Sequence, residues 1–307
     1  MLKRVLSALT ALALLLCGAS ALADTPNDIF PLDYDTLLEP IAGQHHYILM
    51  CVDNWEGNAR NLGNTDGVIM ATFDLAAHRL LFTTFTREML VKRPDGGIGR
   101  FTYIAKNYGV EETLKIISTH FGVKVQKYIV FSMDNVQKII DAMGGVYITV
   151  TNAEADYLNR YLIARDATTP SMDRAGTYLF SGHAAVIYLR IRKVGGDGDA
   201  GRTRRIRTVL TTLTNKYDTI SLDDALKLLT AVTDNTVTTN MTLADMMEGI
   251  GYAMELRGVS PEGIQMPQDD AMTPITYAGM STRQVDFEKS REELQAFLRS
   301  DNYEVTE

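Results

Sequence analysis

Three closely spaced apolar runs constrain the fold of this chain more than any other feature. They occupy residues 47–52, 68–73 and 80–85, and each contains β-branched or aromatic side chains. Continuous apolar runs of this length are typical of strands that are buried on both faces. We therefore expect a central sheet that other elements cover on each side.

Helical signals alternate with further strand signals after the third run. Apolar residues recur at helical spacing over residues 110–121 and stop at Gly122, which favours a helix end there. Strands are expected over residues 125–131 and 146–150, separated by a helix that Asp134 would cap. This order favours an α/β fold in which a mixed sheet is sandwiched between helices, an α-β-α arrangement. Further helices are expected over residues 182–190, 204–217, 222–232 and 243–256.

The first 23 residues have the pattern of a targeting segment. Lys3 and Arg4 precede an apolar run over residues 5–16, and small residues lead to Ala23. This pattern predicts a signal peptide that is cleaved after Ala23, and therefore a protein that acts outside the cytoplasm. The alternative is a retained membrane anchor, because residues 5–23 are just long enough to span a bilayer.

The overall charge argues against a generally basic nucleic-acid-binding protein. The chain carries 30 Lys and Arg against 38 Asp and Glu, which gives a net charge of −8. Neutralising the phosphates of a nucleic acid needs an excess of basic side chains on one face. We therefore expect no nucleic acid partner, and local basic clusters are more informative than the total charge.

One basic cluster stands out in this acidic chain. Residues 190–207 include seven basic side chains against two aspartates. Arg190 and Arg192 lie two residues apart, which in an extended segment aims both guanidinium groups to one side, where they can grip a diphosphate. The alternative is a solvated basic face on the helix that follows, and we favour that interpretation for Arg204 and Arg207.

Two aspartates lie in loops beside the apolar runs. Asp53 follows the first run and Asp66 precedes the second. Carboxylate oxygens beside a diphosphate are suitable ligands for Mg²⁺. The alternative is that both aspartates simply form turns, as loop aspartates often do.

Several short segments, in a fixed order, are similar to the motifs of one known family. Their number and order resemble those of the LytR-CpsA-Psr family, whose members in Gram-positive bacteria move glycopolymers from polyprenyl-diphosphate carriers onto the cell wall. The segments are C-V-D-N at 51–54, N-T-D-G-V-I-M at 64–70, T-F-T-R-E at 84–88, R-F-T-Y at 100–103, I-D-A-M-G-G-V at 140–146, S-G-H-A-A-V-I-Y-L-R-I-R at 181–192 and D-A-G-R-T-R-R at 199–205.

The resemblance implies a helix–sheet–helix sandwich with an apolar cleft for the polyprenyl tail. It implies that Asp53 and Asp66 hold Mg²⁺ as the cofactor, while arginines grip the diphosphate. Asp66 and Asp199 are the candidates for activating the acceptor hydroxyl. The implied diphosphate ligands are Arg87, Arg190, Arg192 and Arg202, and the other implied substrate contacts are Arg100, Asp199 and Arg205.

Four positions depart from the family motifs. Glu88 replaces an Asp, Thr86 a Pro, Thr102 an Asn and Ile206 a Gln. The Glu88 carboxylate can still orient Arg87, but Ile206 cannot hydrogen-bond a phosphate. Two alternatives to transfer therefore stay open. One is a degenerate protein that binds polyprenyl diphosphate or wall polymer, and the other is a pyrophosphatase that releases the glycan to water.

The expected organisation is a signal peptide over residues 1–23, a lead-in over 24–45, a catalytic domain over 46–285, and a C-terminal helix and tail over 286–307. The implied activity is metal-assisted transfer of a glycopolymer from a polyprenyl-diphosphate carrier to peptidoglycan or another wall acceptor. The protein would contact the membrane surface through this lipid substrate.

Overall fold

The computed structural model describes residues 38–54, 61–161, 172, 174–192, 194, 198–216 and 222–299, with the backbone alone at residues 161, 199, 200, 222, 224 and 225. The predicted signal peptide and most of the predicted lead-in lie outside these residues. Within the described part of the chain, no helix is both long and apolar enough to cross a membrane.

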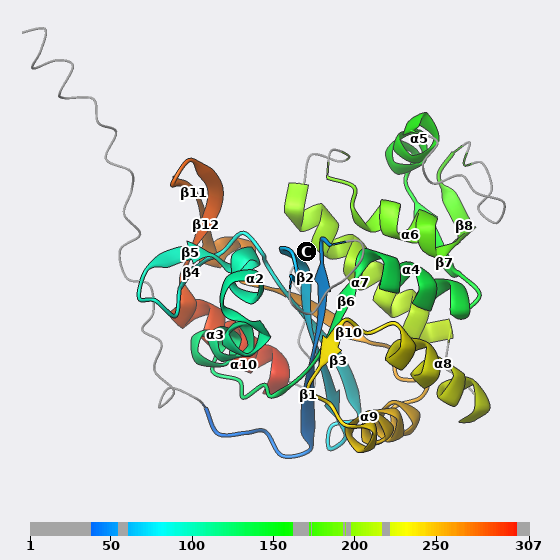
Figure 1. The fold of residues 1–307 in the computed structure, drawn as a ribbon, viewed down its shortest axis with the longest axis horizontal. Coiled ribbons are helices and arrows are strands. Elements are labelled where there is room, and N and C mark those ends of the chain that lie inside the picture. The colour runs from blue at the N-terminus through cyan, green and yellow to red at the C-terminus, as the bar shows by residue number, and fades with distance from the viewer. Residues whose placement is uncertain are drawn as a thin grey trace, which may run out of the picture.

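A six-stranded mixed sheet forms the centre of the molecule (Figure 1). The three apolar runs form strands, as predicted, and the structure places these strands next to one another in the middle of the sheet. The strands, in spatial order, are β10 (Glu262–Met266), β3 (Arg79–Phe85), β2 (Thr65–Asp74), β1 (Gln44–Val52), β6 (Lys127–Ser132) and β9 (Thr238–Thr239). β1 pairs antiparallel with β2 and parallel with β6, which makes the sheet mixed.

Helices cover both faces of the sheet, which confirms the predicted α-β-α sandwich (Figure 1). One face carries α2 (Ile104–Tyr108), α3 (Val110–Phe121) and α10 (Phe287–Arg299). The other face carries α4 (Met133–Ala142), α6 (Gly182–Leu189), α7 (Gly198–Lys216), α8 (Leu222–Asp234) and α9 (Leu243–Glu255).

Shorter elements decorate this sandwich. They include three two-stranded sheets, of which the one formed by β7 and β8 adjoins α4 and α6 on the second face (Figure 1). The remaining elements are β4 (Leu90–Lys92), β5 (Ile98–Arg100), β7 (Val146–Val150), α5 (Asn152–Tyr161), β8 (Gly176–Phe180), β11 (Met272–Tyr277), β12 (Met280–Val285), and the 3-10 turns Phe101–Tyr103 and Asp269–Ala271.

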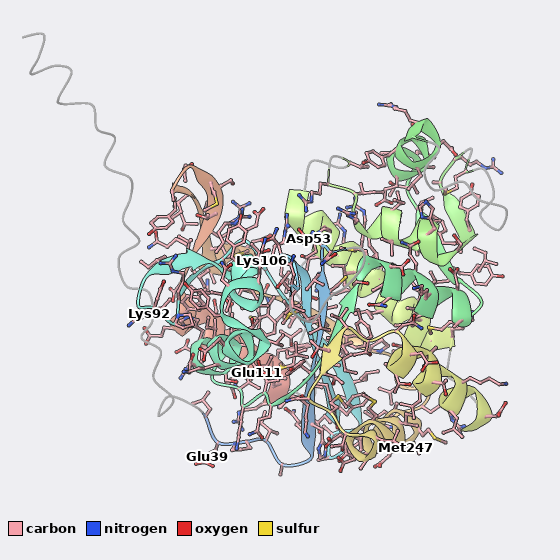
Figure 2. The ribbon with its side chains drawn as sticks, in the orientation of Figure 1. Glu39, Asp53, Lys92, Lys106, Glu111 and Met247 are labelled. Atoms are coloured by element: carbon pink, nitrogen blue, oxygen red, sulfur yellow. The ribbon has the colours of Figure 1, made fainter. Side chains whose placement is uncertain are left out.

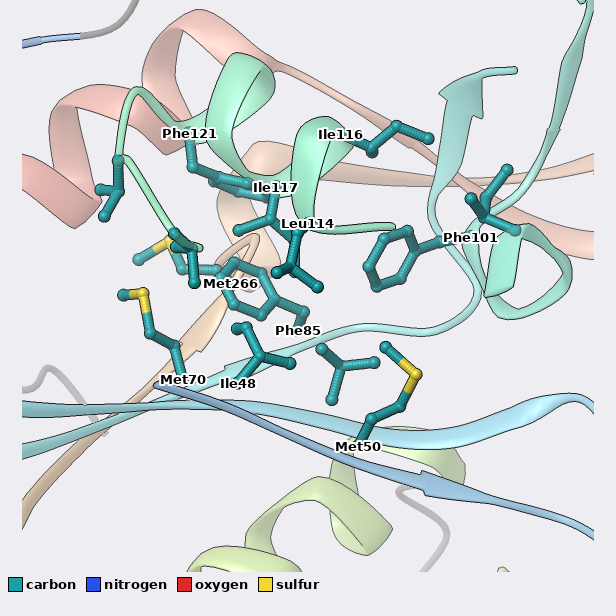
Figure 3. Packing of buried hydrophobic residues seen from close by; sticks show 14 of the residues in the cluster. Ile48, Met50, Met70, Phe85, Phe101, Leu114, Ile116, Ile117, Phe121 and Met266 are labelled. Carbon is teal, nitrogen blue, oxygen red and sulfur yellow. The ribbon is translucent and has the colours of Figure 1, made fainter. Parts of the chain in front are cut away.

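The main core fills the space between the sheet and the α3–α10 face. Figure 3 shows Ile48 and Met50 of β1 packed together with aromatic side chains such as Phe85 and Phe121. Leu49 lies between them in sequence and points to the other face of the sheet, because successive strand residues alternate. Packing on that other face leaves an apolar cavity, described below.

The predicted helix ends were partly right. Gly122 follows α3 with a φ of 72°, the left-handed conformation that glycine adopts at helix ends. Asp134 was the wrong cap for α4. The helix begins earlier because the Ser132 hydroxyl accepts a hydrogen bond from the Asn135 amide at 3.1 Å. In return, the Asn135 Oδ1 atom accepts a hydrogen bond from the Ser132 backbone amide at 3.0 Å. This reciprocal pair of hydrogen bonds is a capping box, and it fixes the start of the helix.

Candidate functional site

Asp66 occupies an irregularity in the pairing of the two central strands. Cys51 pairs with Gly67 while Val52 pairs with Thr65, so Asp66 is an extra residue on β2. A bulge of this kind re-aims the side chain of the extra residue and is common beside functional sites. Asp66 is thereby placed in a buried position, 7% exposed, at the end of the sheet.

Three arginines from distant parts of the chain converge on the Asp66 carboxylate. Its Oδ1 atom accepts hydrogen bonds from Arg87 Nη1 at 2.8 Å and Arg202 Nη1 at 3.0 Å. Arg192 Nη2 lies 3.6 Å from the same oxygen. Arg202 also donates to the Asp66 carbonyl at 2.5 Å. One carboxylate cannot neutralise three guanidinium groups, so this cluster has an excess of positive charge suited to an anionic ligand.

Glu88 adds a second carboxylate beside this cluster. Its Oε1 atom accepts a hydrogen bond from Arg100 Nη2 at 3.2 Å, whereas Arg87 Nη2 lies 3.9 Å away. The short contact of Arg87 is therefore with Asp66, and Glu88 mainly holds Arg100. The wider group of four arginines and two carboxylates remains positively charged.

The arginines keep Asp66 ionised. Burial alone would raise the pKa of this carboxyl, but Arg202 and then Arg87 outweigh burial, so its pKa lies below the ordinary value. A carboxylate with a lowered pKa is a weak base near neutral pH. This geometry therefore favours a countercharge or a metal ligand at Asp66 over a proton acceptor.

Asp53 lies at the end of β1, fixed by a residue of the loop that precedes β2. Its Oδ1 atom accepts the Asn64 backbone amide at 2.7 Å, and its Oδ2 atom accepts the Asn64 side chain at 2.9 Å. Gly63 has a φ of 73°, and a Cβ atom there would lie 2.5 Å from Asp53 Oδ1. A side chain at position 63 would therefore displace the carboxylate.

Asp53 and Asp66 are the two carboxylates of this site that could serve as ligands of Mg²⁺. The ion pairs and hydrogen bonds described above meet at the Oδ1 atom of the Asp66 carboxylate. No group of three or more acidic, His or Cys side chains among the described residues is placed to hold a metal. Mg²⁺ commonly takes only one or two carboxylates and completes its shell with water and substrate phosphates. Asp53 and Asp66 match that donor set.

An apolar cavity of about 200 Å³ opens beside the arginine cluster. Asp66, Arg190 and Arg202 line its polar end, and Ile206 contributes to its apolar wall. Ile206 lies close to Gly67, where a Cβ atom would be 3.6 Å from its Cδ1 atom. The residue that departs from the family motif therefore extends the apolar wall.

A second cavity of about 390 Å³ adjoins the first one. Both lie between the sheet and the helices of the second face, and their linings share Leu49, Leu210, Leu213 and Val232. Away from the arginine cluster the combined lining is apolar except for the polar groups of Tyr47, Thr214 and Arg257. This arrangement can hold a long hydrocarbon chain whose charged head lies at the arginine cluster.

Cys51 lies at the boundary between the charged cluster and the cavity. Burial is the main reason that the pKa of its thiol is raised to about 12, and the Asp66 charge adds to the effect. The thiol contacts the sulfur of Met133 at 3.7 Å. Cys51 is therefore an unreactive strand residue.

Arg205 makes contacts that differ from those expected of a substrate ligand. It is almost fully buried, and its Nε atom donates to Glu154 Oε1 at 2.6 Å. Its other nitrogens donate to the carbonyls of Ile191 at 3.0 Å and Val194 at 3.4 Å. Arg205 thus holds the segment that carries Arg192, and Glu154 is a supporting residue that the sequence analysis missed.

Two further positions complete the account of the predicted residues. Asp199 lies in the first turn of α7, and its side chain lies outside the described residues. Thr102, a departure from the family motif, donates its hydroxyl to the Thr65 carbonyl at 2.7 Å. Its backbone amide donates to the Arg87 carbonyl at 3.0 Å. Thr102 therefore ties together the backbones beside Asp66 and Arg87.

The fold and the charged cluster define an α/β sandwich with an anion site at the mouth of an apolar cavity. A sequence model of the LytR_cpsA_psr family matches residues 42–295. The chain belongs to this family, which confirms the resemblance drawn from the motifs.

Curated relatives are about a quarter identical to the chain over the aligned regions. Biofilm regulatory protein A of Streptococcus mutans is 27% identical over 69% of this chain and 54% of its own length. The polyisoprenyl-teichoic acid–peptidoglycan teichoic acid transferase TagT of Bacillus subtilis is 23% identical over 71% of this chain and 66% of its own length. The chain thus spans between half and two thirds of these relatives.

Solved structures support the fold. A structure titled TagT bound to LI-WTA matches with a TM-score of 0.65 at 18% identity, covering 89% of this chain and 94% of that one. Protein gbs0355 of Streptococcus agalactiae matches with a TM-score of 0.67 at 20% identity, covering 84% and 87%. At these identities the likeness establishes a shared architecture.

Proposed function

We propose that the chain is a phosphotransferase that moves a glycopolymer from a polyprenyl-diphosphate carrier to a cell-wall acceptor. The observation that carries this proposal is the arginine cluster around Asp66 at the polar end of the apolar cavity. The cluster suits a diphosphate and the cavity suits an isoprenoid tail. Several relatives are named as teichoic acid transferases, which supports the same substrate class.

The arginines would act on the charge that develops during transfer. An acceptor hydroxyl oxygen attacks the phosphorus that carries the glycan, and its proton is released. The bond from that phosphorus to the bridging oxygen breaks, and polyprenyl phosphate leaves with the electron pair. Arg87, Arg192 and Arg202 would bind the diphosphate oxygens and stabilise this charge, since preorganised guanidinium groups need little rearrangement.

Asp53 and Asp66 would hold Mg²⁺ at the same site. When bound, the metal would neutralise phosphate charge and help the leaving group depart. Asn64 would keep the Asp53 carboxylate oriented, through the two hydrogen bonds of 2.7 and 2.9 Å. Asp66 would also keep the arginines aligned before the substrate binds.

The fate of a polyprenyl-diphosphate-linked glycan tests this function. We expect wild type to transfer the glycan to a wall acceptor in Mg²⁺, with little product in excess chelator. Arg87→Ala should lower turnover by roughly 100-fold or more. Arg87→Lys should rescue poorly because it lacks the planar fork. Arg93→Ala is the matched control, since Arg93 pairs with Asp95 at 3.0 Å on an exposed turn.

Other products would contradict transfer. Release of the phosphoglycan to water would indicate a pyrophosphatase. Binding of the lipid without any product would indicate a degenerate binding protein. If Arg87→Ala equals wild type in both affinity and turnover, the assignment of this site is wrong.

Export is part of the proposal, because wall acceptors lie outside the cytoplasm. We expect protein from native cells to begin at Asp24, after the predicted signal peptide. Intact-mass measurement checks this. A membrane-embedded chain that retains residues 1–23 would instead indicate an anchored form.

A further inference from the structure

Exposed apolar side chains gather on two neighbouring helices of the second face. Among the described residues, six large hydrophobic side chains are exposed, and four of them lie on α8 and α9. We call these four the apolar rim: Leu226 (40% exposed), Leu243 (65%), Met247 (42%) and Met254 (36%). Such a concentration of exposed apolar side chains marks an interaction surface.

The spacing of the rim residues on α9 forms one continuous stripe. Leu243, Met247 and Met254 are four and seven residues apart, so they lie along one side of the helix. Ile250 belongs to the same side and lines the second cavity, as does Met254 itself. The stripe therefore runs from the cavity wall to the surface without a polar break.

The opposite side of α9 is polar. Asp245 pairs with Lys127 of β6 at 2.8 Å, and the Tyr252 hydroxyl donates to Glu248 at 2.6 Å. The acidic side chains Asp245 and Glu248 therefore point away from the rim. The helix α9 is amphipathic, with one apolar side and one polar side.

The helix α8 repeats this arrangement. Leu226 lies one turn from Leu229, and Leu229 lines the second cavity. Lys227 pairs with Asp223 at 2.5 Å on the exposed side. Both helices thus present an apolar residue beside the cavity. The basic residue that the lining of the second cavity adds is the exposed Arg257, just after α9, and the acidic Glu255 lies two residues before it.

The rim lies at the far end of the cavity from the arginine cluster. Figure 2 shows Asp53 near the middle of the molecule and Met247 at its lower edge. Along β1 the lining runs from Cys51 in the first cavity to Tyr47 in the second, a distance of about 13 Å at roughly 3.3 Å per residue. A hydrocarbon chain held at the arginines can therefore run along the sheet and leave between α8 and α9.

We propose that the apolar rim inserts into a lipid bilayer, so that an isoprenoid tail passes between the membrane and the cavity without crossing water. The identity of that tail rests on the proposed function. The continuity of the rim with the cavity favours a bilayer over a second copy of the chain, because a second copy would cover the opening. The rim lacks excess basic charge, so insertion depends on apolar burial and is largely insensitive to salt.

A local fluorescence readout tests this in the full chain. Trp55→Phe removes the one native tryptophan, and Met247→Trp then places a reporter on the rim. The matched control is Tyr147→Trp, because Tyr147 is also exposed, at 56%, but lies on β7. In phosphatidylcholine vesicles with brominated acyl chains and no polyprenyl lipid, we expect loss of fluorescence at position 247 and none at position 147. The loss should persist in high salt.

Two results would overturn the proposal. One is equal quenching, or no quenching, at the two positions. The other is a lipid-free dimer in which the Met247→Trp reporter is already shielded and bromolipid changes nothing, which would show that a second copy covers the rim.

A paired turnover measurement separates this proposal from the proposed function. Leu243→Asp with Met247→Asp should lower turnover of a long-chain substrate in vesicles by roughly tenfold or more. Turnover of a short-chain, water-soluble analogue should be unchanged, since neither residue lines the cavity. Equal loss on both substrates would contradict docking. If wild type turns over neither substrate, the proposed function fails, and the quenching comparison alone decides the docking proposal.

Discussion

Replacing Asp66 with asparagine is expected to tighten diphosphate binding while abolishing turnover. The carboxylate now competes with the substrate for Arg87 and Arg202, which lie 2.8 and 3.0 Å from its Oδ1 atom. Asp66→Asn keeps the shape but removes that charge, so the affinity for inorganic diphosphate in chelator should rise roughly tenfold or more. Turnover in Mg²⁺ should fall by roughly 100-fold or more, because a ligand of the proposed metal is lost. Calorimetry and product formation measure the two effects.

The same variant should be less stable until the anion binds. The buried arginines lose their countercharge, which costs about 3–5 kcal/mol of unfolding free energy when one partner of a buried pair is removed. Diphosphate should restore much of this stability, because it binds the folded state alone. Thermal unfolding with and without diphosphate measures the recovery, and Asp95→Asn on the exposed turn is the matched control.

The contribution of Asp66 to the free energy of unfolding depends on pH. The pKa of Asp66 in the folded protein is below its ordinary value, so its stabilising contribution is fully present above the unfolded pKa of about 3.9. That contribution is lost as the pH falls through the lower, folded pKa. The stability difference between wild type and Asp66→Asn should therefore shrink on acidification. Unchanged diphosphate affinity, or unchanged turnover, would contradict the role given to Asp66.

The central strands could be predicted because burial on both faces leaves a direct pattern in the sequence. Residues 47–52, 68–73 and 80–85 are apolar at nearly every position, which few other structures allow. The first residue of α7 was harder to predict. The structure begins this helix at Gly198, before the predicted residue 204, because its first turns carry charged and small residues instead of an apolar stripe.

The convergence on Asp66 could be predicted only in part. The motifs indicated Arg87, Arg192 and Arg202, but the bulge that aims Asp66 at them depends on how β1 and β2 align. A one-residue shift in register between paired strands leaves no local signal in the sequence. The cavity is equally hidden, since Leu49 is apolar whether packing or a ligand fills the space beside it.

The ion pair between Arg205 and Glu154 could not be predicted from the sequence. The two residues are 51 positions apart, and a charged residue in a basic cluster suggests a ligand contact more readily than a buried support. The structure replaces that expectation with a different hypothesis, in which Arg205 positions the segment that ends in Arg192. Substitution distinguishes the two.

Arg205→Met is expected to lower both stability and turnover. The substitution leaves the buried Glu154 carboxylate without its guanidinium partner, although its Oε2 atom still accepts a hydrogen bond from the Thr151 amide at 3.0 Å. It also removes the donor to the carbonyls of Ile191 and Val194. Breaking a buried ion pair costs about 3–5 kcal/mol, which lowers the unfolding temperature by on the order of 10 °C in a chain of this size. Turnover should fall because the segment carrying Arg192 loses its support.

A double variant separates positioning from stability. Glu154→Leu combined with Arg205→Met removes the stranded charge and should recover part of the unfolding temperature, because apolar residues can replace a buried ion pair. Turnover should stay low, since the hydrogen bonds to Ile191 and Val194 remain absent. Arg93→Met is the control, as an exposed ion pair contributes at most about 1 kcal/mol. If Arg205→Met instead weakens diphosphate binding with no loss of unfolding temperature, Arg205 contacts the substrate directly and the positioning role is wrong.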